Sequence, residues 1–140
     1  MIRILLLIII STTLSGCGYF NSGTWEDDPE NWNKVFGEDV PKEVEIIHSR
    51  FWKSAHWSYE FEVFFELKTT HSFFQNFFIN NNEVKKVKKL AFQDHYFQEK
   101  PNWFLPKTIE NYVIWTNENE NLKIYVDKKT YHIFYTYFQV

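Results

Sequence analysis

Residues 56–67 alternate apolar and polar side chains more cleanly than any other stretch of this chain. One face of the stretch is apolar, with Trp57, Tyr59, Phe61, Val63, Phe65 and Leu67. The other face is mainly polar, with His56, Ser58, Glu60, Glu62 and Glu66, and is interrupted by Phe64. A period of two is typical of a β-strand that packs one face on a core and leaves the other in water. The pattern predicts an antiparallel sheet whose exposed face carries the three glutamates.

The segments on either side extend this strand into an α+β domain. Residues 44–52 predict a strand that forms a hairpin with residues 56–67 through a turn at 53–55. Residues 111–116, 122–127 and 131–138 predict a three-stranded meander. We expect an antiparallel sheet of about five strands, in the order β-hairpin, helices, three-stranded meander, with the helices packed on one face.

Three segments predict helices. Residues 28–37 begin with Asp28, which can cap a helix, and end at Gly37, so they suit a two-turn helix. Thr70 can cap a second helix, in which Phe73, Phe74, Phe77 and Phe78 share one side. In residues 83–91 the apolar residues have helical spacing with four lysines between them, and a lysine-rich edge strand is the alternative.

The N-terminal residues predict where the protein resides. Arg3 precedes an apolar run at residues 4–10, and small residues follow, as in a secretory signal peptide. The apolar run is too short for a spanning helix, which needs about 20 residues. The sequence Leu14-Ser15-Gly16-Cys17 resembles the bacterial lipobox, in which the cysteine thiol receives diacylglycerol and the chain is cut just before it.

These features divide the chain into three parts. We expect a lipoprotein signal peptide at residues 1–16, a lipidated tether at residues 17–28 and a single periplasmic α+β domain at residues 29–140. Two or more acyl chains, such as palmitate, on Cys17 would hold the protein firmly to the membrane. Lipoproteins that are retained in the inner membrane have Asp directly after the lipidated cysteine, whereas this chain has Gly18. Gly18 therefore favours the outer membrane of the bacterial envelope, with the inner membrane as the alternative.

Composition limits the choice of function. Without residues 1–16, 14 basic and 18 acidic residues remain, which gives a net charge of −4 and no reason to expect nucleic acid as a partner. Cys17 is the only cysteine, so a lipidated chain has no disulfide. Fifteen Phe, eight Tyr and six Trp residues can supply an aromatic-rich core instead.

No motif for phosphate binding, acyl transfer or zinc hydrolysis is present in the sequence. His48 and His56 could meet across the hairpin and bind a metal, but strand histidines are more often ordinary cross-strand partners. Glu60, Glu62 and Glu66 could act as the paired carboxylates of a hydrolase, but alternating glutamates are also the usual outer face of a strand. We therefore expect no enzyme, no metal site and no cofactor.

Several segments resemble known small lipoproteins. Residues 22–32, together with residues 48–54 and 59–62, resemble YafY/YfjS-type prophage-associated lipoproteins. Residues 101–107, with Tyr112 and residues 127–130, are similar to small periplasmic proteins encoded beside secreted toxins. The resemblances imply a membrane-anchored periplasmic protein that acts in envelope stress or in protection against a toxin, and they supply no catalytic residues.

Three binding functions follow as hypotheses, each with the membrane as a further partner through the acyl groups on Cys17. The first is immunity against an envelope-targeting toxin, which would contact Glu60, Glu62 and an aromatic pair, Trp103 and Phe104, laid across the sheet by a proline-rich loop. The second is inhibition of lysozyme through the eight acidic residues between positions 26 and 45. The third is binding of a glycan or lipid, with Trp and Tyr as stacking platforms.

Overall fold

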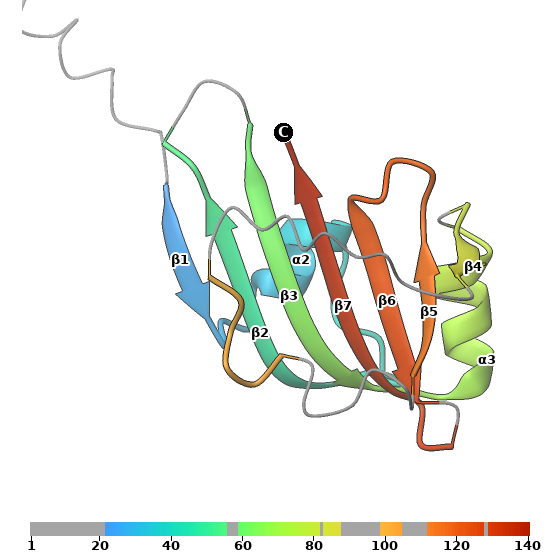
Figure 1. Cartoon of the computed structure of the whole chain (residues 1–140). Helices are drawn as coiled ribbons and strands as arrows, with labels where there is room; N and C mark the ends of the chain where they lie inside the picture. Colours follow the sequence, from blue (N-terminus) through green and yellow to red (C-terminus); the bar gives the residue numbers. More distant parts are fainter. Residues whose placement is uncertain (1–21, 56–58, 82, 88–98, 105–111, 128) are drawn as a thin grey trace, which may run out of the picture.

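The computed structural model describes residues 22–55, 59–81, 83–87, 99–104, 112–127 and 129–140. Over these residues the chain forms one seven-stranded antiparallel sheet with two helical segments (Figure 1). The strands are β1 (Gly23–Glu26), β2 (Glu45–Lys53), β3 (Phe61–Lys68), β4 (Lys85–Val87), β5 (Tyr112–Thr116), β6 (Leu122–Asp127) and β7 (His132–Gln139). The helical segments are α2 (Asn31–Phe36) and α3 (His71–Phe73), which continues as the π-helix η1 (Phe74–Ile79).

The sheet order is β1-β2-β3-β7-β6-β5-β4. The predicted hairpin is formed by β2 and β3, and the predicted meander by β5, β6 and β7. The two units join along β3 and β7, which pair from Phe61 opposite Gln139 to Lys68 opposite His132. The predicted antiparallel sheet is thus confirmed, but it dominates the fold more than expected, and the predicted number of about five strands is too low.

The two additional strands lie at the two edges of the sheet. Residues of β1 were expected to belong to the tether, but they pair with β2. Asn31 fixes this edge strand, because its side-chain amide donates to the backbone carbonyl of Trp25 at 2.9 Å. At the other edge, β4 pairs with β5. For residues 85–87 the alternative of a lysine-rich edge strand is therefore confirmed, and the predicted helix is wrong. Residues 88–91 of that predicted helix lie outside the described residues.

Both helical segments contact the same face of the sheet. Gly37 ends α2 in the left-handed conformation with φ 73°, as predicted for the residue that closes this helix. The indole of Trp32 in α2 is fully buried and lies 5.9 Å from the ring of Phe65 in β3. The ring of Phe78 in η1 lies 5.7 Å from that of Tyr135 in β7. Aromatic packing of this kind supplies the core of a domain in which no disulfide is expected. None of the described helices has the length and apolar composition needed to span a bilayer.

The opposite face of the sheet is also covered, and the expectation that it faces water is wrong. Glu62 is 0% exposed and Phe64 only 1%. The ring of Phe104 packs on Phe64 at 4.9 Å, and the guanidinium of Arg50 lies over the same Phe64 ring at 5.1 Å. Arg50 also donates a hydrogen bond to the backbone carbonyl of Glu99. Residues 99–104 therefore lie across this face, so β3 is buried on both sides.

Candidate ligand-binding groove

The residues predicted to bind a partner do not form one exposed surface. Phe104 and Glu62 are buried, at 1% and 0% exposure, so a partner cannot reach either side chain in this conformation. Trp103 is half-buried, and its ring stacks on His48 at 5.3 Å. Glu60 is also half-buried, and its backbone carbonyl accepts a hydrogen bond from Ser54 at the end of the hairpin. Cys17, the predicted site of lipid attachment, lies outside the described residues.

The histidines and glutamates that were weighed for a metal or a catalytic site have other partners or lie outside the described residues. His48 lies 3.3 Å from the carboxylate of Asp27, whereas His56 lies outside the described residues. Glu66 forms a 2.7 Å ion pair with His132 instead of joining Glu62. In the part of the chain that the structure describes, no three His, Cys, Asp or Glu residues are grouped to hold a metal ion.

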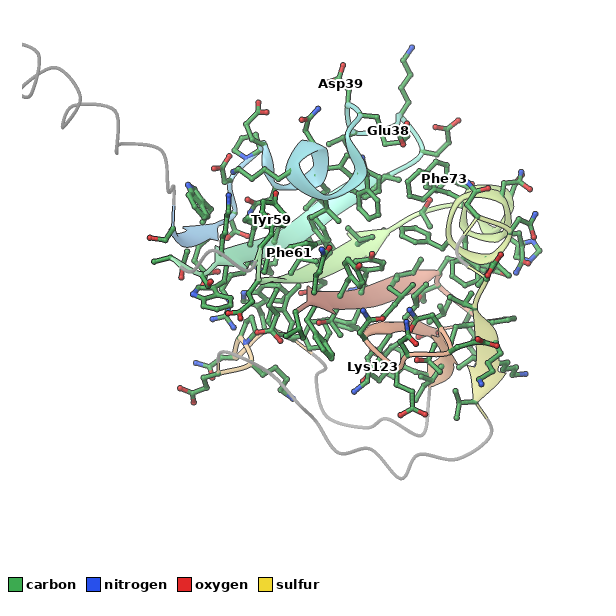
Figure 2. The ribbon with its side chains drawn as sticks, turned by 90° about the horizontal axis from the view of Figure 1, so that it is seen from above. Glu38, Asp39, Tyr59, Phe61, Phe73 and Lys123 are labelled. Carbon is green, nitrogen blue, oxygen red and sulfur yellow. The ribbon has the colours of Figure 1, made fainter. Side chains whose placement is uncertain are left out.

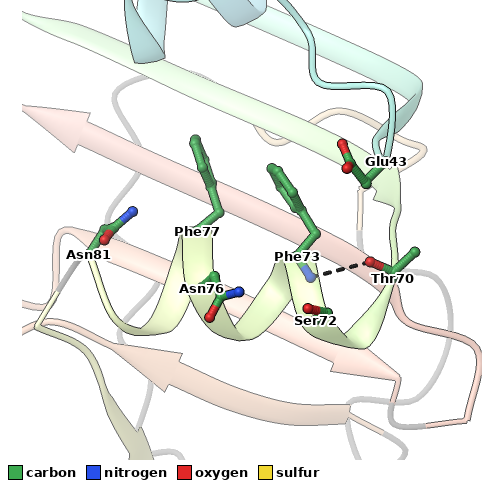
Figure 3. Close-up of a pocket in the computed structure, with 7 residues that line it drawn as sticks. All are labelled: Glu43, Thr70, Ser72, Phe73, Asn76, Phe77 and Asn81. Carbon is green, nitrogen blue, oxygen red and sulfur yellow. Dashed lines mark hydrogen bonds between the residues drawn. The ribbon is translucent and has the colours of Figure 1, made fainter.

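The four phenylalanines of the helical segment after β3 all pack against one core, and two of them also line a groove. Thr70 caps the segment, since its hydroxyl accepts a hydrogen bond from the backbone N–H of Phe73 at 3.2 Å (Figure 3). The turn then widens, and the N–H of Asn80 donates to the carbonyl of Gln75, five residues earlier. Phe74 and Phe78 are buried, while the half-buried Phe73 and Phe77 stack on each other at 4.9 Å. These two rings line a groove of about 350 Å³ beside Glu43 (Figure 3).

A second groove lies on the other side of this helical segment, above the edge of the sheet, and we name it the Trp115 groove. Its volume is about 390 Å³. It is lined by His71, Phe74, Gln75, Lys86, Val113, Trp115, Val126 and Tyr131. The lining combines three aromatic side chains with an amide, an imidazole and an ammonium group. Ligand sites typically have this size and this mixture of apolar walls and few polar groups.

The floor of the Trp115 groove is set by strand pairing. Lys86 of β4 lies directly opposite Trp115 of β5, so the two side chains share one face of the sheet. Lys86 is exposed, and the half-buried Trp115 indole is held edge-on against Phe74 at 6.4 Å. Lys85, the neighbour of Lys86 in β4, points to the opposite face because successive strand residues alternate.

The wall formed by Tyr131 depends on a strained backbone. Tyr131 has φ 51°, a left-handed conformation that is uncommon for aromatic residues and costs about 1–3 kcal/mol. Two hydrogen bonds hold it: its N–H donates to the Asp127 carbonyl at 2.8 Å, and its carbonyl accepts from the Thr69 N–H at 3.3 Å. The conformation places the Tyr131 ring 5.1 Å from the ring of His71. Strain of this kind is concentrated at functional sites.

Sequence reasoning missed the Trp115 groove because no local pattern encodes it. Its residues come from α3, η1, β4, β5, β6 and the turn before β7. Only the register of β4 with β5 brings Lys86 beside Trp115. The general expectation that Trp and Tyr could act as stacking platforms was the nearest signal.

Comparison of the chain with known protein families, with curated proteins and with solved structures finds no match.

Proposed function

We propose that this protein is a membrane-anchored periplasmic lipoprotein that binds an anionic cell-wall glycan in the Trp115 groove, without catalysing a reaction. The observation that carries the proposal is the pairing of Lys86 with Trp115 on the floor of a groove walled by Tyr131 and Gln75. The signal sequence and the lipobox support a location at the envelope, where such a glycan is the most abundant polymer.

The groove offers each of the contacts that a charged sugar needs. A pyranose ring has an apolar face of C–H groups, which can stack on the indole of Trp115 or the ring of Tyr131. Its hydroxyl groups can bond to the Gln75 amide, which has two donors and an acceptor. A carboxylate on the glycan can accept a charge-assisted hydrogen bond from the Lys86 ammonium.

Burial of the aromatic residues favours this function over immunity against a toxin. The immunity hypothesis depended on exposed aromatic anchors surrounded by glutamates. Within the described residues, the large hydrophobic side chains that are well exposed are Val40, Tyr59 and Val140, and only one of them is aromatic. Most of the described aromatic residues instead pack in two hydrophobic cores, one on each face of the sheet. A concave groove is therefore a better candidate for the binding site than an exposed aromatic surface.

Isothermal titration calorimetry with a muramic-acid-containing disaccharide, which carries a carboxylate, tests the proposal. We expect Lys86→Gln to weaken binding about tenfold or more, since a hydrogen bond to a charged group is worth about 1.5–3 kcal/mol. Lys85→Gln is the matched control, because it removes the same charge from the opposite face of the same strand. Equal affinities of the two variants, or no binding by the wild-type protein, would contradict the proposal.

A second candidate function, inhibition of lysozyme, is favoured by a cleft on the acidic side of the molecule. The cleft has a volume of about 290 Å³ and is lined by Asp27, Asp28, Pro29, Val40, Ile46, Ile47 and Ser49. Val40 is 39% exposed within it, and Glu38 and Asp39 precede Val40 and are exposed. An apolar centre beside carboxylates suits a cationic protein partner.

An assay of lysozyme activity at low and high salt tests this second candidate. Inhibition should be present at low ionic strength and should fall as salt screens the charges. Asp39→Lys should weaken inhibition several-fold, whereas Glu118→Lys, in the turn between β5 and β6, should have little effect. Absence of inhibition at low salt would remove this function.

A further inference from the structure

We propose that one corner of the sheet rests in the interfacial layer of the membrane to which the chain is anchored. We name it the Tyr59 corner, and it consists of Lys53, Ser54, Ala55 and Tyr59 at the tip of the β2–β3 hairpin. The inference rests on the proposed lipid anchor at Cys17 and adds the protein surface that the bilayer meets.

The tether is too short to keep this corner far from the membrane. Gly23 begins β1 and pairs with Lys53 at the end of β2, and Lys53 in turn pairs with Phe61 at the start of β3. Neighbouring strands lie about 5 Å apart, so the corner is within two strands of the point where the tether joins the sheet. Only residues 18–22 separate Cys17 from Gly23, and their full extension reaches about 20 Å.

The opposite end of the sheet is much further away. β3 contains eight residues from Phe61 to Lys68, which corresponds to about 25 Å along the strand. The turn between β6 and β7 lies at that far end, next to Lys68 and His132 (Figure 1). A domain tethered through Gly23 therefore meets the bilayer with the end that carries the Tyr59 corner.

The chemistry of the corner suits the membrane interface. Tyr59 is 56% exposed and is the one aromatic residue among the well-exposed large hydrophobics of the described chain. Its ring rests edge-on against Phe61 at 5.8 Å (Figure 2), and the Lys53 ammonium lies 4.5 Å from the ring centre. Tyrosine is enriched at headgroup level because its ring is apolar and its hydroxyl is polar, and a lysine beside it can reach lipid phosphates.

Charge distinguishes the corner, whose one neighbouring carboxylate among the described residues is the half-buried Glu60, from the other turn at this end of the sheet. The turn between β5 and β6 lies at the same end, but it carries the exposed Glu118 and Glu120. Anionic headgroups repel these carboxylates, so the domain should lean on the β1–β2–β3 side.

Site-directed spin labelling of the full-length lipidated protein in vesicles with anionic lipid tests this inference. The thiol of Cys17 carries the lipid, so a cysteine introduced elsewhere is the one that reacts with the nitroxide. Labels at Ala55→Cys and Tyr59→Cys report on the corner. Lys129→Cys at the far end and Glu118→Cys in the acidic turn are the controls.

Labels at the corner should collide more with oxygen than with a water-soluble nickel chelate, and the control labels should show the reverse. Adding Tyr59→Glu to Ala55→Cys should move the label at position 55 towards the aqueous result. The mass of the protein first establishes that Cys17 carries lipid. If the corner labels on such a protein are as accessible to the chelate as the control labels, this inference alone is overturned. A chain without lipid at Cys17 would overturn the anchor and this inference together.

Discussion

Tyr131 has a backbone conformation that an aromatic residue keeps only when its surroundings impose it. The turn between β6 and β7 imposes this conformation, and Asp127 accepts the hydrogen bonds that hold the turn together. Its carboxylate accepts hydrogen bonds from the backbone N–H groups of Lys129 at 2.8 Å and Thr130 at 3.4 Å. Its backbone carbonyl binds the N–H of Tyr131 at 2.8 Å. One residue thus organises the turn that sets a wall of the Trp115 groove.

The charge of Asp127 should make the turn sensitive to acid. The hydrogen bond from the backbone of Lys129 is the main cause that lowers the pKa of Asp127 below its usual value. A group with a lowered pKa in the folded state stabilises the fold above its unfolded pKa, and this contribution is lost as pH falls through the folded pKa. Asp127→Asn keeps an oxygen acceptor but removes the charge.

We therefore expect Asp127→Asn to be less stable than the wild type at pH 7 and equally stable once the pH lies well below about 4. Urea denaturation at a series of pH values measures this convergence. Asp39→Asn, which removes an exposed carboxylate outside the turn, should leave the stability close to that of the wild type. A constant difference between Asp127→Asn and wild type at every pH would contradict the electrostatic explanation.

At the scale of elements, the segment from Thr70 to Ile79 separates the two grooves and supplies side chains to both. Its first turn is α-helical and its second is π-helical, so residues four apart in sequence fall nearly in line. Phe73 and Phe77 line one groove and Phe74 lines the Trp115 groove, while all four phenylalanines pack against the same core. The sequence pattern correctly predicted the helix, its cap and the packing of all four rings against one core.

The cap at Thr70 should be worth a measurable part of the stability. Thr70→Ala removes the acceptor for the Phe73 N–H and should cost about 1 kcal/mol of unfolding free energy. Thr70→Ser keeps a hydroxyl at the same place and should cost little. Chemical denaturation of the two variants beside wild type distinguishes a lost cap from a general loss of packing, which would affect both variants equally.

The strands that could be predicted are those in which apolar and polar residues alternate along the sequence. β2 and the meander match their predicted ranges within about one residue because alternation within each strand decides them, whereas β3 begins at Phe61, five residues after its predicted start. β1 and β4 have four and three residues, and only their pairing with β2 and β5 makes them strands. Phe104 and Arg50 cover Phe64 from outside the strand, so the alternation within β3 could not reveal that this face is buried.

On the scale of the whole molecule, the two structural units depend on each other through the pairing of β3 with β7. These two strands lie at the middle of the sheet, with partners on both sides, and β3 packs against a core on each face. The edge strands β1 and β4 have one partner each. Stability should therefore decrease from the centre of the sheet to its edges.

Native-state hydrogen exchange should reveal this gradient. Amides of residues 61–68 and 132–139 that bond within the sheet should exchange most slowly, at rates set by global unfolding. Amides of β1 and β4 should exchange faster by at least about tenfold, because local opening of an edge exposes them. Uniform protection across all seven strands would show instead that the edges open only with the whole domain.

The central position of β7 also determines when the chain can fold. Before residue 139 has been synthesised, β3 lacks its second neighbour and β6 has no strand to join it to the hairpin. A growing chain therefore carries two additional open strand edges and an incomplete core until β7 has emerged. The proposed export as an extended chain would benefit from this late closure, because it delays folding on the cytoplasmic side. During the proposed export, the same order of events would leave the unfinished chain in need of a chaperone that shields strand edges.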